Sequence, residues 1–171
     1  MFIRIGWRDS ALLVFAELID GDIFTRARAD NQRLWELGDV FEMFFRPTTQ
    51  ESYVELQVAP NNKRLQLRYP DARAVAQARK LGSADHLVIH ERAFLSLTWV
   101  YADDQKWFVF AKIPVKTVCE RASLPDVEWL FSFSRYDYIR NGNAPVISST
   151  SQHKIADFHR QVEWGVMRFE D

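Results

Sequence analysis

Residues 39–69 contain three short segments in which apolar and polar side chains alternate, separated by turns rich in Pro, Thr and Asn. Alternation with a period of two predicts antiparallel strands with one face on a core and the other toward solvent. The expected core face holds Phe41, Met43, Phe45, Val54, Leu56, Val58, Leu65, Leu67 and Tyr69. The opposite face is polar and consists of Glu42, Glu55, Gln57, Arg64, Gln66 and Arg68. The pattern therefore predicts an open sheet face made of acids, amides and arginines.

The two faces also predict the register of these strands. A slip by one residue would exchange the buried and exposed sets, so we expect Glu42 to pair with Glu55 or Gln57. The same reasoning across the turn at 60–63 places Glu55 near Arg68. Glu42, Glu55 and Arg68 are then expected to lie side by side on adjacent strands.

Strand-like segments continue along the chain, separated by turn sequences such as IDGD at 19–22 and YADDQK at 101–106. They cover 2–7, 11–18, 39–46, 52–59, 64–69, 87–90, 93–101, 107–113, 128–138 and 162–169. Short strands without alternating helices predict an all-β chain, an antiparallel β-sandwich of immunoglobulin-like or jelly-roll type. Its length suits one domain over residues 1–171. The Ala- and Arg-rich segment 71–81 is the exception, and we expect a short helix or a mobile connection there.

Charge and composition exclude several function classes. The formal net charge is −1, which gives no electrostatic footprint for nucleic acid or an anionic membrane. No apolar run is long enough to span a membrane, and the first residues do not form a signal peptide. We therefore expect a cytoplasmic protein, or an exported one whose leader has been removed.

Cys119 is the single cysteine, so no intramolecular disulfide can form. The sequence leaves the oligomeric state open.

The 24 aromatic residues (13 Phe, 6 Trp and 5 Tyr) suffice for a core and leave rings for a surface. Trp99, Trp107, Trp129 and Trp164 lie within strand-like segments and are expected in the core. Trp35 differs because it lies in the polar loop NQRLWELG. It can either stand beside the polar sheet face or fold inward as a cap on the core.

Two segments of this region resemble the front half of carbohydrate-binding module family 9: LWELGDVFEMFFRP (34–47) and YVELQVAPNNKRLQLR (53–68). The family pattern there is a tryptophan loop, an acidic strand and a strand that bears an arginine. WFVFAKIP (107–114), WLFSFSRYDY (129–138) and the segment 148–169 resemble its later strands. The resemblance covers nearly the whole chain and extends to the wider DOMON-like sandwiches. It implies a β-sandwich that binds a mono- or oligosaccharide without catalysis.

The family holds its sugar between two aromatic rings, while an acid and an arginine bond the hydroxyls. The resemblance implies that Trp35 is the first ring, Glu42 the acid and Arg68 the arginine. The family's second tryptophan is absent, because valine and isoleucine stand at 146–147. Tyr136 or Tyr138 is expected to supply that wall. The predicted carbohydrate-binding residues are Trp35, Glu42, Glu55, Arg64, Arg68, Tyr136 and Tyr138.

These residue types suit a pyranose. An aromatic ring contacts the C–H face of the sugar through dispersion and its π cloud. Charged side chains bond the hydroxyls, at about 1.5–3 kcal/mol for each hydrogen bond. One ring with two charged partners predicts affinities between about 1 mM and 1 μM.

Two other functions are weighed against sugar binding. Glu42 and Glu55 could act as the acid and base of a glycoside hydrolase, which needs carboxyls about 5–9.5 Å apart. A haem-binding electron-transfer domain would use Met43 or Met167 with His153 or Lys154 as axial ligands. Haem is disfavoured, because Met43 alternates with core phenylalanines and is expected to fill the core.

No metal ligand or cofactor is assigned from the sequence. The resemblance leaves calcium open, since relatives of this family carry calcium sites. The acids near the turns lack the tight spacing of a calcium loop: Asp20, Asp22, Asp103 and Asp104. The familiar signatures of hydrolases and nucleotide-binding proteins are also absent from the sequence.

Overall fold

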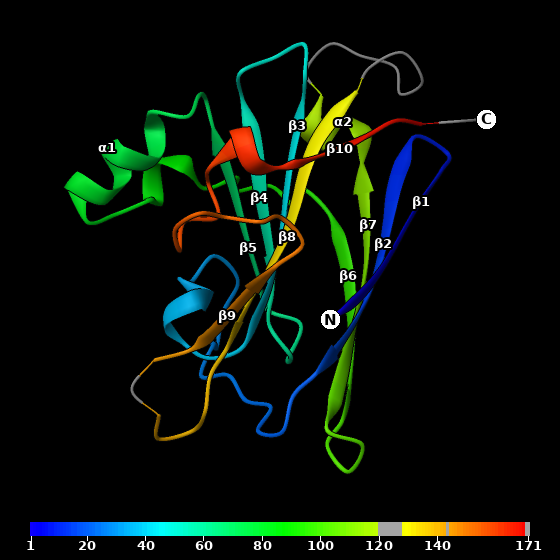
Figure 1. The fold of residues 1–171 in the computed structure, drawn as a ribbon, viewed down its shortest axis with the longest axis vertical. Coiled ribbons are helices and arrows are strands. Elements are labelled where there is room, and N and C mark those ends of the chain that lie inside the picture. The colour runs from blue at the N-terminus through cyan, green and yellow to red at the C-terminus, as the bar shows by residue number, and fades with distance from the viewer. Residues whose placement is uncertain (120–127, 143, 170–171) are drawn as a thin grey trace.

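The computed structural model describes residues 1–119, 128–142 and 144–169, which form two antiparallel sheets packed face to face (Figure 1). One sheet has four strands in the order β1-β2-β7-β6. The other has six, in the order β10-β8-β3-β4-β5, with β9 paired to β8. This arrangement confirms the predicted all-β, antiparallel β-sandwich.

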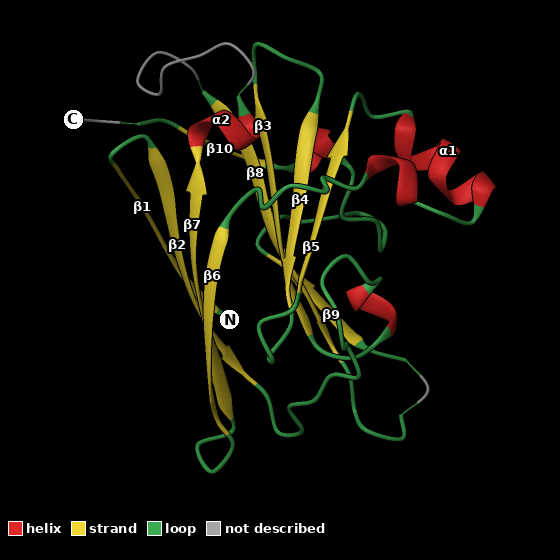
Figure 2. Cartoon of the chain, turned by 180° about the vertical axis from the view of Figure 1, so that it is seen from behind, coloured by secondary structure: helices red, strands yellow, loops and turns green. Residues whose placement is uncertain are grey.

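The elements of the two sheets come from both halves of the chain (Figure 2). The four-stranded sheet contains β1 (Phe2–Arg8), β2 (Ala11–Ile19), β6 (Leu95–Tyr101) and β7 (Lys106–Pro114). The six-stranded sheet contains β3 (Val40–Pro47), β4 (Tyr53–Val58), β5 (Arg64–Tyr69), β8 (Trp129–Asp137), β9 (Val146–Ser149) and β10 (Gly165–Met167). The helical elements are η1 (Leu34–Glu36), α1 (Ala74–Leu81), η2 (Asp85–Leu87), α2 (Val115–Val118) and η4 (Gln161–Glu163).

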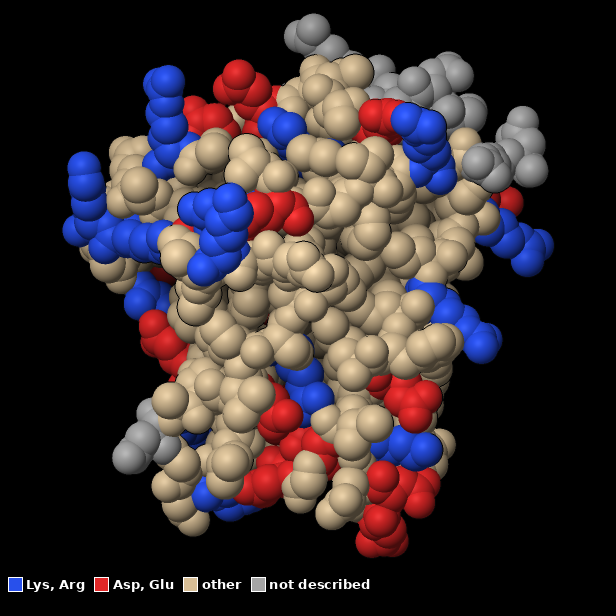
Figure 3. All heavy atoms as spheres, viewed as in Figure 1, with Lys and Arg blue, Asp and Glu red and all other residues tan. Residues whose placement is uncertain are grey.

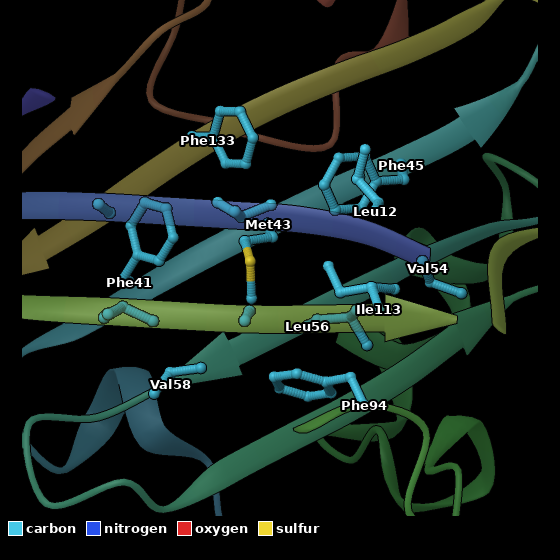
Figure 4. Close-up of a cluster of buried hydrophobic side chains, with 14 of the residues drawn as sticks. Leu12, Phe41, Met43, Phe45, Val54, Leu56, Val58, Phe94, Ile113 and Phe133 are labelled. Atoms are coloured by element: carbon cyan, nitrogen blue, oxygen red, sulfur yellow. The ribbon is translucent and has the colours of Figure 1, made fainter. Parts of the chain in front are cut away.

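The sandwich core lies between the sheets and is built by apolar side chains at every second position of strands from both sheets (Figure 4). On the six-stranded sheet these include Phe41, Met43 and Phe45 of β3 and the apolar positions 54, 56 and 58 of β4, as predicted. Phe41 and Phe133 stack with their ring centroids 5.7 Å apart. Met43 is fully buried in this core.

The register between β3 and β4 confirms one of the two predicted pairings, because Glu42 lies opposite Gln57. The register between β4 and β5 differs from the prediction by one residue. Glu55 lies opposite Leu67, and Arg68 lies opposite Val54. The prediction of Glu55 next to Arg68 was therefore wrong, and the two side chains leave opposite faces of the sheet.

The outer face of the six-stranded sheet is covered rather than open to solvent, which corrects a second expectation. A second apolar cluster joins this face to η1, α1 and the C-terminal segment, and includes Leu34, Phe44, Leu67, Val75 and Trp164. As a result the polar residues on this face are almost completely buried. Glu42 and Glu55 each expose 3%, and Gln57 exposes 0%.

Four segments differ from or refine the predicted elements. Residues 87–90 are not a strand: Leu87 ends η2, and the residues after it join β5 through the bridge between Leu67 and Val88 and a hydrogen bond from Ile89 N–H to the Gln66 carbonyl. The last predicted strand shortens to Gly165–Met167, and β9 was not expected. The segment 71–81 does form a helix, which ends at Gly82 in the left-handed conformation (φ 64°).

Three of the four strand tryptophans lie in a core, as predicted: Trp107, Trp129 and Trp164. Trp99 does not; it points outward from β6 and exposes 43% of its surface. Among the described residues, no helix has the length and apolar character needed to cross a membrane.

Candidate functional site

A pocket of about 290 Å³ opens in the layer that covers the six-stranded sheet. Three strands supply its floor through Glu42 of β3, Glu55 of β4 and Tyr69 of β5. Its walls come from the Trp35 loop, α1, Tyr136 and residues 156–159. On this side of the molecule, charged side chains of both signs lie around α1 and the C-terminal segment (Figure 3). The pocket therefore combines segments that are far apart in the sequence.

The two carboxylates of the floor share one amide group. Gln57 donates from Nε2 to Glu42 Oε1 at 2.7 Å and also to Glu55 Oε1. The second oxygen of Glu55 accepts a hydrogen bond from the Tyr69 hydroxyl at 2.9 Å. The Tyr69 ring in turn stacks on Tyr53, with the centroids 4.6 Å apart and the planes 6° from parallel. This network fixes both carboxylates from below and leaves them bordering the pocket.

Burial changes the protonation of Glu42. Loss of solvent is the main cause, and the negative charge of Glu55 is the second; together they raise the pKa of Glu42 well above its usual range. The shared amide satisfies one oxygen of each acid but adds no positive charge. Glu42 therefore keeps its proton to a higher pH than an exposed glutamate does.

His159 lies beside this network. Its Nδ1 is 3.0 Å from the Tyr53 hydroxyl, and its Nε2 is 3.7 Å from Glu55 Oε2. Burial lowers the pKa of His159, in spite of the nearby acids. A neutral ring whose Nδ1 accepts a hydrogen bond from the Tyr53 hydroxyl carries its own proton on Nε2, facing Glu55. His159 then supplies a neutral hydrogen-bond donor at the pocket.

An ion pair links α1 to the C-terminal loop at the rim of the pocket. Arg79 contacts Asp157 through both terminal nitrogens, at 2.9 and 3.3 Å. Burial raises the pKa of Asp157, but the hydrogen bond from Arg79 and other contacts outweigh it and leave the pKa below its usual value. Arg33 donates to the Gly82 carbonyl and so ties the Trp35 loop to the end of α1.

The structure places the three predicted aromatic residues together. Trp35 lies on η1, is half-buried and lines the pocket. Tyr136 also lines it and packs edge-on against Phe158, with the centroids 5.6 Å apart. Tyr138 does not line the pocket; its hydroxyl donates to the Trp35 carbonyl and supports the loop from behind. The contact by Tyr138 thus positions Trp35.

Gly38 permits the close return of the Trp35 loop onto residues 24–25. Its φ is +140°, and a Cβ at this position would lie 2.6 Å from the Phe24 carbonyl oxygen. Thr25 and Gly38 form a bridge, and Asp39 donates its backbone N–H to Phe24 at 2.9 Å. Only glycine fits this approach, and the loop that carries Trp35 depends on it.

The two predicted arginines lie away from the pocket. Arg68 donates to the Thr117 carbonyl at 2.6 Å, and Arg64 pairs with Asp30 at 2.9 Å. Both residues occupy the face of β5 opposite to Glu55, because the register places Arg68 across from Val54. The structure therefore brings together Trp35, Glu42, Glu55 and Tyr136, holds Tyr138 behind them, and separates Arg64 and Arg68 from them.

Several residues of the pocket were missed by the sequence reasoning: Tyr69, Arg79, Asp157, Phe158 and His159. Tyr69 had been assigned to the sandwich core, and the correct register alone would have moved it beside Glu55. Arg79 and Asp157 are separated by 78 residues and carry no local signal for their pairing.

A second group of acids lies at the end of the sandwich, where Asp20, Asp39 and Asp137 approach within 4.8 Å of one another. The guanidinium of Arg135 contacts Asp20 at 2.8 Å and Asp137 at 2.9 Å. Burial is the main cause that raises the pKa of Asp39 to about 7. Arg135 therefore brings a positive charge to two of these three carboxylates.

The axial residues considered for haem are placed apart from the pocket. Met43 lies in the sandwich core, whereas Met167 is half-buried on β10. His153 contacts Glu163 through Nδ1 at 3.1 Å. Neither methionine lines the pocket on the outer face.

The fold is a β-sandwich similar to that of carbohydrate-binding module family 9. A candidate carbohydrate-binding protein from Bacteroides uniformis ATCC 8492 superposes with a TM-score of 0.72 at 15% identity, over 98% of this chain and 77% of that one. A family 9 module from Caldicellulosiruptor kristjanssonii in complex with glucose gives a TM-score of 0.64 at 15% identity, over 98% and 75% of the two chains.

A further family 9 structure from Caldicellulosiruptor kristjanssonii, in complex with cellotriose, superposes with a TM-score of 0.51 at 17% identity, over 86% of this chain and 62% of that one. No protein-family model matches the chain, and no curated protein matches it. At these identities the similarity establishes the fold.

Proposed function

We propose that this protein binds a mono- or oligosaccharide, without catalysis, in the pocket between Trp35 and Glu42. The observation that carries the proposal is an aromatic wall beside a floor of paired carboxylates in one pocket of about 290 Å³. Glucose and cellotriose are bound by family 9 modules with this fold, which supports the ligand class.

Each wall has a role in this proposal. Trp35 stacks on the C–H face of a pyranose, and Tyr136 with Phe158 closes the other side. Glu42 and Glu55 contact hydroxyls from the floor, where the network around Gln57 holds them. A protonated Glu42 both donates and accepts, which suits a hydroxyl that does the same.

The donors differ from those implied by the resemblance. His159 Nε2 and the rim residue Arg79 lie at the pocket, whereas Arg64 and Arg68 do not. We therefore assign the donor role to His159 and Arg79. The donors differ from the predicted ones because the register of β5 places Arg64 and Arg68 on the face of the sheet opposite to Glu55.

The volume limits the ligand. Pockets for drug-sized ligands occupy about 300–1,000 Å³, and this one lies just below that range. It suits one sugar ring, either a monosaccharide or the end of a longer chain. The number of polar contacts leads us to expect a Kd between about 1 mM and 1 μM.

Calorimetric titration with glucose, cellobiose, cellotriose and xylose tests the proposal. We expect Trp35→Ala to weaken binding at least tenfold, because it removes the stacking surface. Trp99→Ala is the matched control, since Trp99 is an exposed tryptophan on the other sheet and should leave the affinity unchanged. Equal affinities for wild type and Trp35→Ala would show that the pocket has been misassigned.

The non-catalytic part of the proposal is tested separately. Glu42→Gln keeps the shape of the side chain and its acceptor for Gln57. Release of reducing sugar by the wild type that disappears in Glu42→Gln would make the pair Glu42 and Glu55 a hydrolytic site instead.

A further inference from the structure

The floor of the pocket carries two acids that no cation balances among the residues that the structure describes. The Arg, Asp and Glu side chains that line the pocket are Arg33, Glu42, Glu55, Arg79 and Asp157. Arg79 pairs with Asp157 at 2.9 Å, and Arg33 pairs with Glu36 at 3.3 Å. Each cation at the rim therefore has an acid of its own, and Glu42 and Glu55 remain without one.

The strands on either side of Glu42 supply no positive charge. Gln57 lies across from Glu42 on β4, and Ser134 lies across from it on β8. The Gln57 amide is neutral, and the Ser134 hydroxyl donates to Ser149 at 3.3 Å instead of to the acid. The pair of acids is therefore bonded from the sheet by neutral groups only.

The ionisable groups that face the acids from the other elements are neutral as well. His159 Nε2 is 3.7 Å from Glu55 Oε2, and burial lowers the pKa of this imidazole. Tyr136 of β8 also lines the pocket, and burial raises the pKa of its hydroxyl. Both side chains are uncharged near neutral pH and leave the charge of the two carboxylates uncompensated.

One oxygen of Glu42 is open toward the pocket. Glu42 exposes 3% of its surface, and its Oε1 accepts the hydrogen bond from Gln57 at 2.7 Å. No group of the described residues donates to its Oε2, although Glu42 lines the pocket. The buried Oε1 of Gln57 also lacks a donor. The floor therefore has more acceptors than donors, which suits an ammonium group, with three donors and no acceptor.

One nitrogen can bond both carboxylates. Nε2 of Gln57 already does so from the sheet, donating to Glu42 and to Glu55. A carboxylate oxygen has two lone pairs and accepts a second hydrogen bond from the pocket side. A divalent cation fits less well, because it takes six or more oxygen ligands. Among the described residues, only Asp20, Asp39 and Asp137 meet as a group of three such ligands.

We propose, on the basis of the sugar-binding function above, that the pocket takes a sugar ring with a free amino group, whose ammonium contacts Glu42 and Glu55. The ring stacks on Trp35, and its remaining hydroxyls face His159 and Arg79. Glu42 holds a proton in the free protein and releases it to solvent when the ammonium binds. The positive charge of the ligand then balances the carboxylate that is formed.

Calorimetric titration at about pH 6, where an aliphatic amine is protonated, tests the proposal. The ligands are glucosamine, galactosamine and kanosamine, which differ in the position of the amine or of a hydroxyl, beside glucose and N-acetylglucosamine. At least one amino sugar should bind about tenfold more tightly than glucose, which corresponds to about 1.4 kcal/mol. N-Acetylglucosamine should show no such gain, because its amide carries no charge.

Glu42→Gln removes the charge and keeps the shape of the side chain. The ratio of the affinities for the amino sugar and for glucose should fall close to one in this variant. The ratio is the readout because Glu42 belongs to the pocket and its replacement also affects glucose. Glu51→Gln is the matched control, since Glu51 is exposed in the turn between β3 and β4, and it should keep the wild-type ratio. Circular dichroism checks that both variants are folded.

The pH dependence provides a second readout. Titrations in buffers of different ionisation enthalpy at about pH 5 should show that the wild type releases protons on binding the amino sugar and not on binding glucose. The affinity for the amino sugar should also rise between about pH 5 and pH 6.5, more steeply in the wild type than in Glu42→Gln. Titration of His159 is common to both proteins and cancels in this comparison, while Arg79 and Asp157 stay charged.

Two results would overturn the proposal while leaving sugar binding in place. They are glucose binding as tightly as every amino sugar, and a preference for the amino sugar that persists in Glu42→Gln. Cyclohexylamine binding as tightly as the best amino sugar would also overturn it, because the amine alone would then be recognised. Absence of binding by all of these sugars would instead remove the sugar-binding function itself.

Discussion

Replacement of Glu42 by glutamine should change how the stability of the protein depends on pH. Glu42 exposes 3% of its surface and faces Glu55 across the amide of Gln57. Burial first, and Glu55 second, raise the pKa of Glu42 well above the 4.5 of an exposed glutamate. Glutamine has the same shape, keeps an oxygen for Gln57 and cannot ionise.

The sign follows from the number of protons bound in each state. Above about pH 4.5 the unfolded chain releases the Glu42 proton, whereas the folded chain keeps it. The folded state therefore binds one proton more, and the free energy of unfolding falls as the pH rises. The limiting slope is about 1.4 kcal/mol per pH unit for one proton. Between about pH 4.5 and the raised pKa of Glu42, the wild type should therefore lose stability relative to Glu42→Gln, at no more than this slope.

Urea unfolding, followed by tryptophan fluorescence at several pH values between 4.5 and 7.5, measures this difference. The comparison between wild type and Glu42→Gln removes the contribution of all other titrating groups to first order. Glu51→Gln is the matched control, because Glu51 is exposed in the turn between β3 and β4. Its curve should run parallel to that of the wild type. Parallel curves for Glu42→Gln as well would mean that Glu42 is ionised in the folded protein and would refute the argument.

Three further changes probe other parts of the structure. Arg68→Ala should leave sugar affinity unchanged in calorimetry, because its guanidinium points away from the pocket. Gly38→Ala should lower the free energy of unfolding by about 2 kcal/mol or more in urea titrations, since its Cβ would lie 2.6 Å from a backbone oxygen, whereas Gly6→Ala has open space and should not. Arg135→Ala should cost about 3–5 kcal/mol of stability and make the melting temperature respond to added calcium, to which the wild type should be indifferent.

The results that would contradict these three predictions are specific. Loss of sugar binding in Arg68→Ala would show that Arg68 does contribute to the sugar-binding site. A Gly38→Ala protein as stable as Gly6→Ala would mean that the loop relaxes at little cost. A wild type whose melting temperature rises on addition of calcium would show that Arg135 does not replace a cation.

Local alternation predicted the strands and the inner faces of β3 and β4 from the sequence. Phe41, Met43 and Phe45 face the sandwich core as expected, and Glu42 pairs with Gln57. The same pattern failed on β5, where Leu65 and Leu67 face the outer cluster. Both faces of this sheet are buried, so an apolar side chain does not by itself indicate which core it joins.

The pocket could be predicted only in part for a related reason. Trp35, Glu42 and Glu55 lie in or beside the strands that carry the pattern, and they do meet. Arg79 and His159 come from a helix and a loop whose docking depends on tertiary contacts. Trp99 was misplaced because a tryptophan in a strand was taken as core, and the pattern of β6 does not show which of its two faces points outward.

The burial of both faces of the six-stranded sheet has a consequence for how a ligand can enter. Glu42 and Glu55 stand on the central strands β3 and β4, whose backbone hydrogen bonds are shielded on either side, so their amides should exchange with solvent only when the whole protein unfolds. The rim, held by Arg79 and Asp157, can open without disturbing these strands. The rigid floor of the pocket should accordingly determine which sugars bind. The rim above it should determine how fast they associate and dissociate.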